Sequence, residues 1–455
     1  MARVMTRTLA IWTLVVSLMA APAVWAETLT DALISAYKNS GLLDQNRALL
    51  RAADEDVAQA VATLRPVLNY FANATYSEPI RDPTGDRVTG SLGLSAEWLL
   101  YDGGGSKLAV EAMKETVLAT REGLIDIEQQ VLLRAVTAYM NVRRDAEVVA
   151  LRQNNVRVIG QQLRAAKDRF EVGEVTRTDV SLAESRLAQA RAGLAAAQGA
   201  LAASREEYKV AVGRFPKSLK SPPRVPRTAK NLATARSIAL TEHPLVKRTK
   251  HEVAAADLGA ARAAAAMKPR LTLNGRVAID QNRNDSSSLG LQLGGPIYQG
   301  GKLSAIYRQA LARRDAVRAG LHTVGLNVSQ GVGNAWARLQ VARATLVASN
   351  QQIRAARVAF RGVKEEATLG ARTTLDVLDA EQELLDAQAN RVSAITDEYI
   401  AAYSLLSAMG LLTVDHLKLG IKTYDPAAYY NAVRRAPATS ARGKRLDAVM
   451  RALGK

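Results

Sequence analysis

Two very long helical stretches dominate the hydrophobic pattern of the chain. Residues 106–171 and 302–368 contain no proline, and at ~1.5 Å per residue each would be about 100 Å long. In the first stretch, apolar or aromatic residues recur at every seventh position, at Leu118, Ile125, Leu132 and Tyr139. A heptad repeat of this kind is typical of a coiled-coil seam. The sequence therefore predicts helices that need lateral partners along their length.

A second helix is predicted after each long stretch, at 176–212 and at 373–410. Gly173 and Gly370 lie between the two helices of each pair, and glycine is the residue that most easily adopts the left-handed conformation at a helix end. The later helix of the second pair has its own heptad seam, made of Leu378, Leu385, Val392, Tyr399 and Leu406. Each pair is therefore expected to form a long αα-hairpin.

Two segments of alternating polarity precede each long helix and are predicted as strands, at about 66–78 and 88–101 and at about 269–281 and 287–298. Pro66 and Pro269 separate them from early helices at 42–65 and 244–267, because proline lacks the amide donor that a helix needs. The pattern is clearest in the second half, where one face is apolar: Leu271, Leu273, Val277, Ile279, Leu289, Leu291 and Leu293. Such alternation fits a barrel wall in a membrane, and it also fits a soluble hairpin.

The connections between these elements are rich in turn residues. The segments 79–87 and 282–287 are polar tips between paired strands. Glycines follow the second strand of each pair, at Gly103, Gly104, Gly300 and Gly301. Their spacing matches no phosphate-binding loop, so we expect them to turn the strand into the long helix.

The chain contains one internal duplication. An offset of 197 residues superposes three pairs around the hairpin turns: Gly173 on Gly370, Thr176 on Thr373, and Asp179 on Asp376. The same offset superposes Glu184 on Glu381 and Tyr101 on Tyr298. We expect a first repeat at 27–220, a second repeat at 221–415 and a C-terminal region at 416–455.

The first 26 residues have the features of a cleaved signal peptide. Arg3 and Arg7 precede an apolar run from Leu9 to Ala21, and cleavage is expected after Ala26. The run is too short to span a bilayer, and no later stretch is long and apolar enough to do so. An exported chain without such a helix would be periplasmic, secreted or a small β-barrel protein. The chain has no cysteine, which excludes disulfides and an N-terminal lipid anchor.

The net charge of +18 changes this picture little. Nucleic acid is a common partner of basic proteins, but the signal peptide directs this chain away from it. The segment 434–455 holds seven Lys or Arg residues and one Asp, so we expect a solvated, disordered basic tail.

The residues indicate no catalytic site. The four histidines are scattered and none has metal-ligand spacing: His243, His251, His322 and His416. Thiol catalysis needs a cysteine, and no serine lies in a nucleophile elbow. We therefore expect no enzymatic activity, no metal and no cofactor.

Acidic residues follow both hairpin turns. Thr176 with Asp179, and Thr373 with Asp376, have the spacing of a capping box with Asp in the place of Glu or Gln. Capping alone would explain these two acids. Asp379 lies one turn further along the same helix face, and capping explains it less well. The residues by themselves leave a structural and a functional role open.

Four segments resemble the TolC family of outer-membrane efflux and secretion channels. They are PIYQGGKLS (296–304) and LGARTTLDVLDAEQELLDAQ (369–388), with WLLYDGGGSKL (98–108) and FEVGEVTRTDV (170–180) in the first repeat. The resemblance covers about 28–415. It implies a mainly α-helical protein with a small membrane β-barrel part. In a homotrimer, four strands from each chain would close a 12-stranded barrel, and the coiled-coil helices would form a periplasmic tunnel.

The same resemblance implies a function. The trimer would be the outer-membrane exit duct of a tripartite export system and would extend into the periplasm. A periplasmic adaptor would connect it to an inner-membrane ABC or proton-driven transporter, and protein or small-molecule substrates would leave the cell through it. Outer-membrane lipid would be a partner and nucleic acid would not. The alternatives are a periplasmic coiled-coil adaptor, which usually has one hairpin and β-rich domains, and a secreted structural coiled coil, which would not need the strands.

The resemblance also assigns roles near the hairpin turns. Asp376 and Asp379 would line the periplasmic aperture, and Arg372 with Asp179 would belong to a network that holds it shut. Three copies would form a carboxylate ring that attracts cations. Two positions depart from the family pattern: Ala367 stands where an aromatic residue is frequent, and NSGLL (39–43) lacks the proline of EHPLV (242–246).

Overall fold

The protein is mainly α-helical with one small sheet, as the sequence predicts. A computed structural model describes residues 26–76, 88–435, 444 and 448, and the structural statements below concern these residues. The predicted signal peptide, the strand tip at 79–87 and most of the basic tail lie outside them. Among the described residues, no helix is both long and apolar enough to cross a bilayer.

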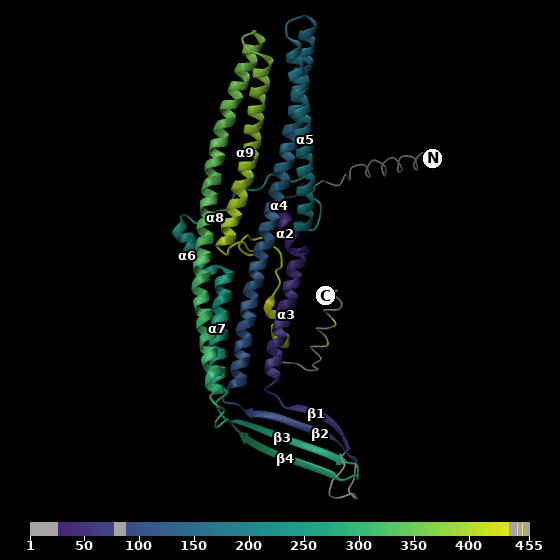
Figure 1. The fold of residues 1–455 in the computed structure, drawn as a ribbon, viewed down its shortest axis with the longest axis vertical. Coiled ribbons are helices and arrows are strands. Elements are labelled where there is room, and N and C mark those ends of the chain that lie inside the picture. The colour runs from purple at the N-terminus through teal and green to yellow at the C-terminus, as the bar shows by residue number, and fades with distance from the viewer. Residues whose placement is uncertain (1–25, 77–87, 436–443, 445–447, 449–455) are drawn as a thin grey trace, which may run out of the picture. The chain divides into compact units, whose positions relative to one another are not determined.

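Each half of the chain contains two early helices, two strands and two long helices in the same order (Figure 1). The first half consists of α2 (Leu29–Asn39), α3 (Gly41–Ala62), β1 (Val67–Tyr76), β2 (Val88–Tyr101), α4 (Gly105–Glu171) and α5 (Arg177–Val212). The second half consists of α6 (Leu232–Glu242), α7 (Pro244–Ala265), β3 (Arg270–Asp280), β4 (Asp285–Gly294), α8 (Lys302–Thr368) and α9 (Thr374–Ala408). A short helix, α10 (Pro426–Val433), follows.

The hydrophobic pattern does not predict α2, α6 or α10, which are too short to show a heptad seam. A local signal exists for α2, because Thr28 and Asp31 form a capping box at its start. The last strand also differs from the prediction. β4 ends at Gly294 and not at 298, because Pro296 cannot donate a ladder hydrogen bond.

The chain divides into two compact units. Unit 1 comprises Met1–Ser40, Val131–Thr228 and Ala335–Leu405. Unit 2 comprises Gly41–Gln130, Ala229–Asn334 and Leu406–Lys455. Both repeats contribute to each unit, so the duplication does not produce one unit per repeat.

Unit 2 contains a four-stranded antiparallel sheet in the order β1-β2-β3-β4. The register places Leu94 opposite both Tyr70 and Val277, and it places Leu273 opposite Leu291. Cross-strand partners share a face, so one face of the sheet is largely apolar, with Ser287 of β4 opposite Val277. Many of its large side chains are exposed: Leu68, Tyr70, Leu92, Leu94, Val277, Leu289, Leu291 and Leu293.

The opposite face of the sheet is polar and tightly packed near its centre. The guanidinium of Arg276 lies 4.0 Å from the ring centroid of Phe71. A side chain at Gly93 would collide with the Phe71 ring and with the backbone of Val277. The strands therefore have chemically distinct faces, and β1 and β4 form the two edges of the sheet.

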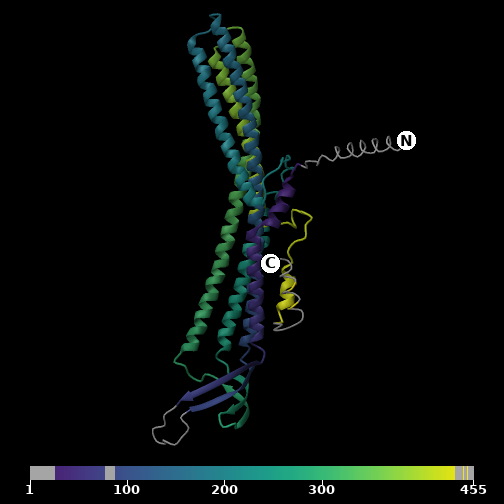
Figure 2. The same ribbon diagram turned by 90° about the vertical axis from the view of Figure 1, so that its right-hand side faces the viewer.

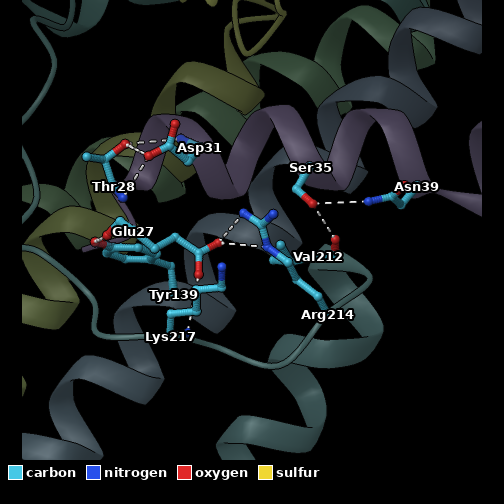
Figure 3. Close-up of polar contacts among 9 residues, drawn as sticks. All are labelled: Glu27, Thr28, Asp31, Ser35, Asn39, Tyr139, Val212, Arg214 and Lys217. Atoms are coloured by element: carbon cyan, nitrogen blue, oxygen red, sulfur yellow. Dashed lines mark hydrogen bonds and ion pairs between the residues drawn. The ribbon is translucent and has the colours of Figure 1, made fainter. Parts of the chain in front are cut away.

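In unit 1, Glu27 ties the start of the predicted mature chain to the connector between the repeats (Figure 3). Its buried carboxylate accepts hydrogen bonds from Arg214 at 2.7 and 3.2 Å and from the backbone amide of Lys217 at 3.4 Å. Its backbone pairs with Ser218 and Lys220 at 2.8 and 2.9 Å. A buried charge needs such partners, so these contacts fix the chain at residue 27.

In unit 2, the segment around α10 packs on α3 and α4. Tyr430 joins the apolar cluster of Leu50, Val57 and Val117, and the guanidinium of Arg121 lies 5.1 Å from the Tyr430 ring. Asp54 of α3 is fully buried, and neither of its carboxylate oxygens has a hydrogen-bond partner among the described residues. Burial raises the pKa of Asp54 to about 6. The C-terminal region is thus folded at least to residue 435.

Candidate functional site

The turns of the two long hairpins lie at the same end of unit 1 (Figures 1 and 2). Gly173 joins α4 to α5 with φ of 82°, and Gly370 joins α8 to α9 with φ of 76°. In the first turn the amide of Glu174 donates to Arg169 O at 2.9 Å, and in the second the amide of Ala371 donates to Glu366 O at 2.9 Å. Both turns therefore end their helices in the same Schellman motif.

Glycines also adopt positive φ where the second strand of each pair turns into the long helix. The values are 70° and 90° at Gly103 and Gly104, and 58° and 84° at Gly300 and Gly301. In the first repeat the carboxylate of Asp102 accepts hydrogen bonds from the amides of Gly104 and Ser106. These glycines shape the junction between strand and helix in unit 2.

The helices after the two hairpin turns have equivalent caps. The carboxylate of Asp179 accepts from the backbone and hydroxyl of Thr176 at 2.9 and 2.7 Å. The carboxylate of Asp376 accepts from the backbone and hydroxyl of Thr373 at 2.9 and 2.9 Å. In each repeat these hydrogen bonds lower the pKa of the aspartate. Both acids therefore stay charged well below neutral pH.

The other two candidate residues have partners that the sequence did not indicate. Asp379 pairs with Arg186 of α5 at 2.7 Å. Arg372 pairs with Glu366 of α8 at 2.9 Å, and this hydrogen bond raises the pKa of Arg372. Within the described residues of one chain, Asp179 is occupied by its cap and Arg372 by Glu366. The predicted link between Arg372 and Asp179 is therefore not formed inside one chain.

Next to these residues, α9 contacts the first hairpin along a line that we call the hairpin seam. It consists of Leu378, Asp379, Glu381 and Asp386 on α9, facing Arg152, Asn155 and Ile159 on α4 and Ala183, Arg186 and Ala190 on α5. Leu378 packs in the apolar cluster with Ile159 and Ala183. The sequence had indicated Leu378 as part of a heptad seam and Asp379 as a candidate residue, but it did not indicate that the first hairpin covers them.

The turns themselves carry exposed apolar side chains. Val172 is 72% exposed and Leu369 is 85% exposed, and Phe170, two residues before Val172, has a half-exposed ring. Isolated exposed apolar residues are common, but here both hairpin turns present them. Among the described residues, no group of three His, Cys, Asp or Glu side chains could hold a metal ion.

Comparison with known proteins identifies the class. The sequence profile of the family "Outer membrane efflux protein" matches residues 33–214 and 235–411, one match in each repeat. The outer membrane efflux protein BepC of Brucella suis is 36% identical over 420 residues, which are 90% of this chain and 91% of BepC. TolC of Vibrio cholerae is 27% identical over 416 residues, or 86% of this chain and 92% of TolC. Among solved structures, CusC has a TM-score of 0.77 at 19% identity and covers 85% of this chain and 92% of its own.

The chain belongs to the outer membrane efflux protein family. The resemblance to TolC channels that the sequence motifs indicate is thereby confirmed, and so is the predicted location in the outer membrane with an extension into the periplasm. The family consists of channel and transport proteins.

Proposed function

We propose that the protein is the outer-membrane exit duct of a tripartite export system and works as a homotrimer. The observation that carries this proposal is the sheet of unit 2. It has four strands, two open edges at β1 and β4, and an exposed apolar face. An unpaired strand edge is not viable in lipid. In the proposed trimer, β1 of one copy pairs with β4 of the next, and the four strands of each chain contribute to a 12-stranded barrel.

The partners follow from the family and from the exposed residues at the hairpin turns. Residues 1–26 are removed on export, and Glu27 starts the mature chain. The long helices of three copies form a periplasmic tunnel. The exposed apolar residues Phe170, Val172 and Leu369 at the hairpin turns supply a surface for a periplasmic adaptor. The adaptor connects the duct to an inner-membrane ABC or proton-driven transporter, whose substrates are proteins or small molecules.

The hairpin turns form the aperture of this duct. Three copies of Asp376 and Asp379 surround the axis and favour cations. Since Arg372 and Asp179 have other partners within one chain, their proposed link forms between neighbouring copies in the closed trimer. Opening separates the hairpins and breaks these contacts.

The barrel can be tested with two adjacent residues on opposite faces of β4. Leu291 belongs to the apolar face and Gln292 to the polar face. An arginine facing lipid near the membrane midplane costs ~2–4 kcal/mol, whereas one facing the lumen does not. Leu291→Arg should therefore reduce the amount of heat-modifiable trimer in the outer-membrane fraction, and Gln292→Arg should not.

Two results would contradict the proposal. One is equal assembly of the two arginine variants, which would remove the lipid-facing assignment. The other is a monodisperse monomer when the purified mature protein is measured by light scattering in detergent.

A further inference from the structure

Glu381 is an ionisable residue in an apolar position of the hairpin seam. It lies on α9 between Leu378 and Leu385, one turn from each, and all three are buried, with Glu381 only 7% exposed. A buried carboxylate without a compensating charge or full hydrogen bonding is costly. Packing therefore does not explain why a glutamate lies between these two buried leucines.

The partner of Glu381 is Asn155 of α4. The amide nitrogen of Asn155 donates to Glu381 Oε1 at 3.5 Å. Two atoms of this pair, Glu381 Oε2 and Asn155 Oδ1, have no hydrogen-bond partner among the described residues. Both are acceptors when the carboxyl is ionised. A single proton on Glu381 would give Oε2 a donor and let the acid and the amide bond each other through both pairs of atoms.

Among the described residues, the basic groups near Glu381 form no ion pair with it, so they do not compensate a negative charge on its carboxylate as a proton would. On α4, Arg152 is engaged by Asp386, and on α5, Arg186 is engaged by Asp379. On α8, Lys364 acts on Glu381 only through its field. Burial outweighs the hydrogen bond and this field, and it raises the pKa of Glu381 to about 7.

The first repeat shows the same glutamate in a different environment. Glu184 is the equivalent of Glu381, and Lys167 is the equivalent of Lys364, at the same offset of 197. Lys167 and Glu184 form an exposed ion pair at 2.8 Å. The duplication therefore provides an internal control: one copy of the glutamate is an ordinary surface partner, and the other is buried between two hairpins.

We propose that Glu381 is a further gate residue: when protonated it bonds Asn155 and holds α9 on the first hairpin, and when ionised it releases this contact and the aperture opens more readily. The inference rests on the aperture function proposed above. Because the folded state raises the pKa of Glu381 above its ordinary value, the stabilisation is complete in acid and is lost as the pH rises through about 7. The seam is therefore tight at acidic pH and loose at alkaline pH.

The test is a set of bilayer recordings on trimers of the wild type, Glu381→Gln and the matched control Glu184→Gln. Glutamine keeps the shape of the neutral acid and can donate to Asn155 Oδ1. Between about pH 5.5 and 8.5, the resting conductance of the wild type should rise on the order of tenfold, the change that one pKa unit of coupling gives. Glu381→Gln should keep the low value at both pH values, and Glu184→Gln should behave as the wild type.

The proposal is overturned if the wild type shows no such rise, if Glu381→Gln retains it, or if Glu184→Gln abolishes it. Hydrogen exchange of segments 153–160 and 377–386 in detergent-solubilised trimers gives a readout that does not need conduction. Exchange there should accelerate with pH beyond its intrinsic dependence in the wild type and not in Glu381→Gln. If that difference is present but no preparation conducts, the exit-duct function fails and the proton-controlled contact stands.

Discussion

The first hairpin, α4 with α5, and the second, α8 with α9, have equivalent turns but differ in the residues with which they contact each other. Both turn at a glycine with positive φ and restart at a threonine capped by an aspartate. Both also contain the same apolar cluster, with Ala190 and Leu187 in the first and the equivalent Ala387 and Leu384 in the second. In their turns, caps and internal apolar clusters the two hairpins are therefore alike.

The difference begins where the hairpins meet each other. The cluster of the first hairpin also includes Leu378, which belongs to the second. Asp379 of the second hairpin likewise contacts Arg186 of the first, and Glu381 contacts Asn155. At the equivalent positions the first repeat has Leu182 and the exposed Glu184. The two hairpins therefore share their local structure, and they differ at the positions where they contact each other.

The largest effect is expected from removing the apolar contact between the hairpins. Leu378 is buried in the cluster of the first hairpin, so Leu378→Ala should cost ~2–5 kcal/mol. Ile353→Ala is the matched control, because it creates a cavity inside the second hairpin. Hydrogen exchange should show that Leu378→Ala loosens both hairpins, whereas Ile353→Ala loosens α8 and α9 only. If both variants affect the same segments, Leu378 does not connect the two hairpins.

The next largest effect concerns the charges of the aperture. Asp376→Ala with Asp379→Ala should remove most of the cation preference and weaken block by multivalent cations on the order of tenfold, because the local field is lost. Bilayer reversal potentials and titration with a trivalent cation measure both effects. Thr373→Ala is the control, since it weakens the cap and leaves the charges. If this control reproduces the loss, the two aspartates act only as caps.

At the two helix caps we expect an effect smaller than that of the aspartate double variant and equal in the two repeats. Thr176→Ala and Thr373→Ala should each destabilise the first turn of the following helix by ~1 kcal/mol, measured as faster hydrogen exchange there. Since the pKa values of Asp179 and Asp376 are lowered, the cap stabilisation is present at neutral pH and is lost only as the pH falls through these lowered values. A clear inequality between the two variants would show that the hairpin ends are not equivalent.

The smallest effect is expected at Arg372, whose pair with Glu366 is half exposed. Exposed ion pairs stabilise little, so Arg372→Ser should raise the resting conductance only a few-fold. Asp179→Ala should raise the conductance to a similar extent, and the double variant should add less than the sum of the two single effects if the two residues meet between neighbouring copies. A double variant whose effect is the full sum would show that Arg372 and Asp179 act in separate contacts.

Features that depend on local periodicity and backbone preference could be predicted from the sequence. The heptad seams indicated the long helices, the alternation indicated the faces of the strands, and the Thr-x-x-Asp spacing indicated both caps. The repeat offset related Gly173 to Gly370, and the two have nearly the same φ. These features involve residues a few positions apart, so a single sequence contains their cause.

Which residues of the two hairpins meet could not be predicted from the sequence, because it depends on the packing of the folded chain. Asp379 is 193 positions from Arg186, and Glu381 is 226 positions from Asn155. No periodicity specifies such pairs, because a helix face shows which side is buried but not what covers it. For the same reason the sequence aligned Glu184 with Glu381 as equals, and the packing of α9 on the first hairpin left one in water and buried the other.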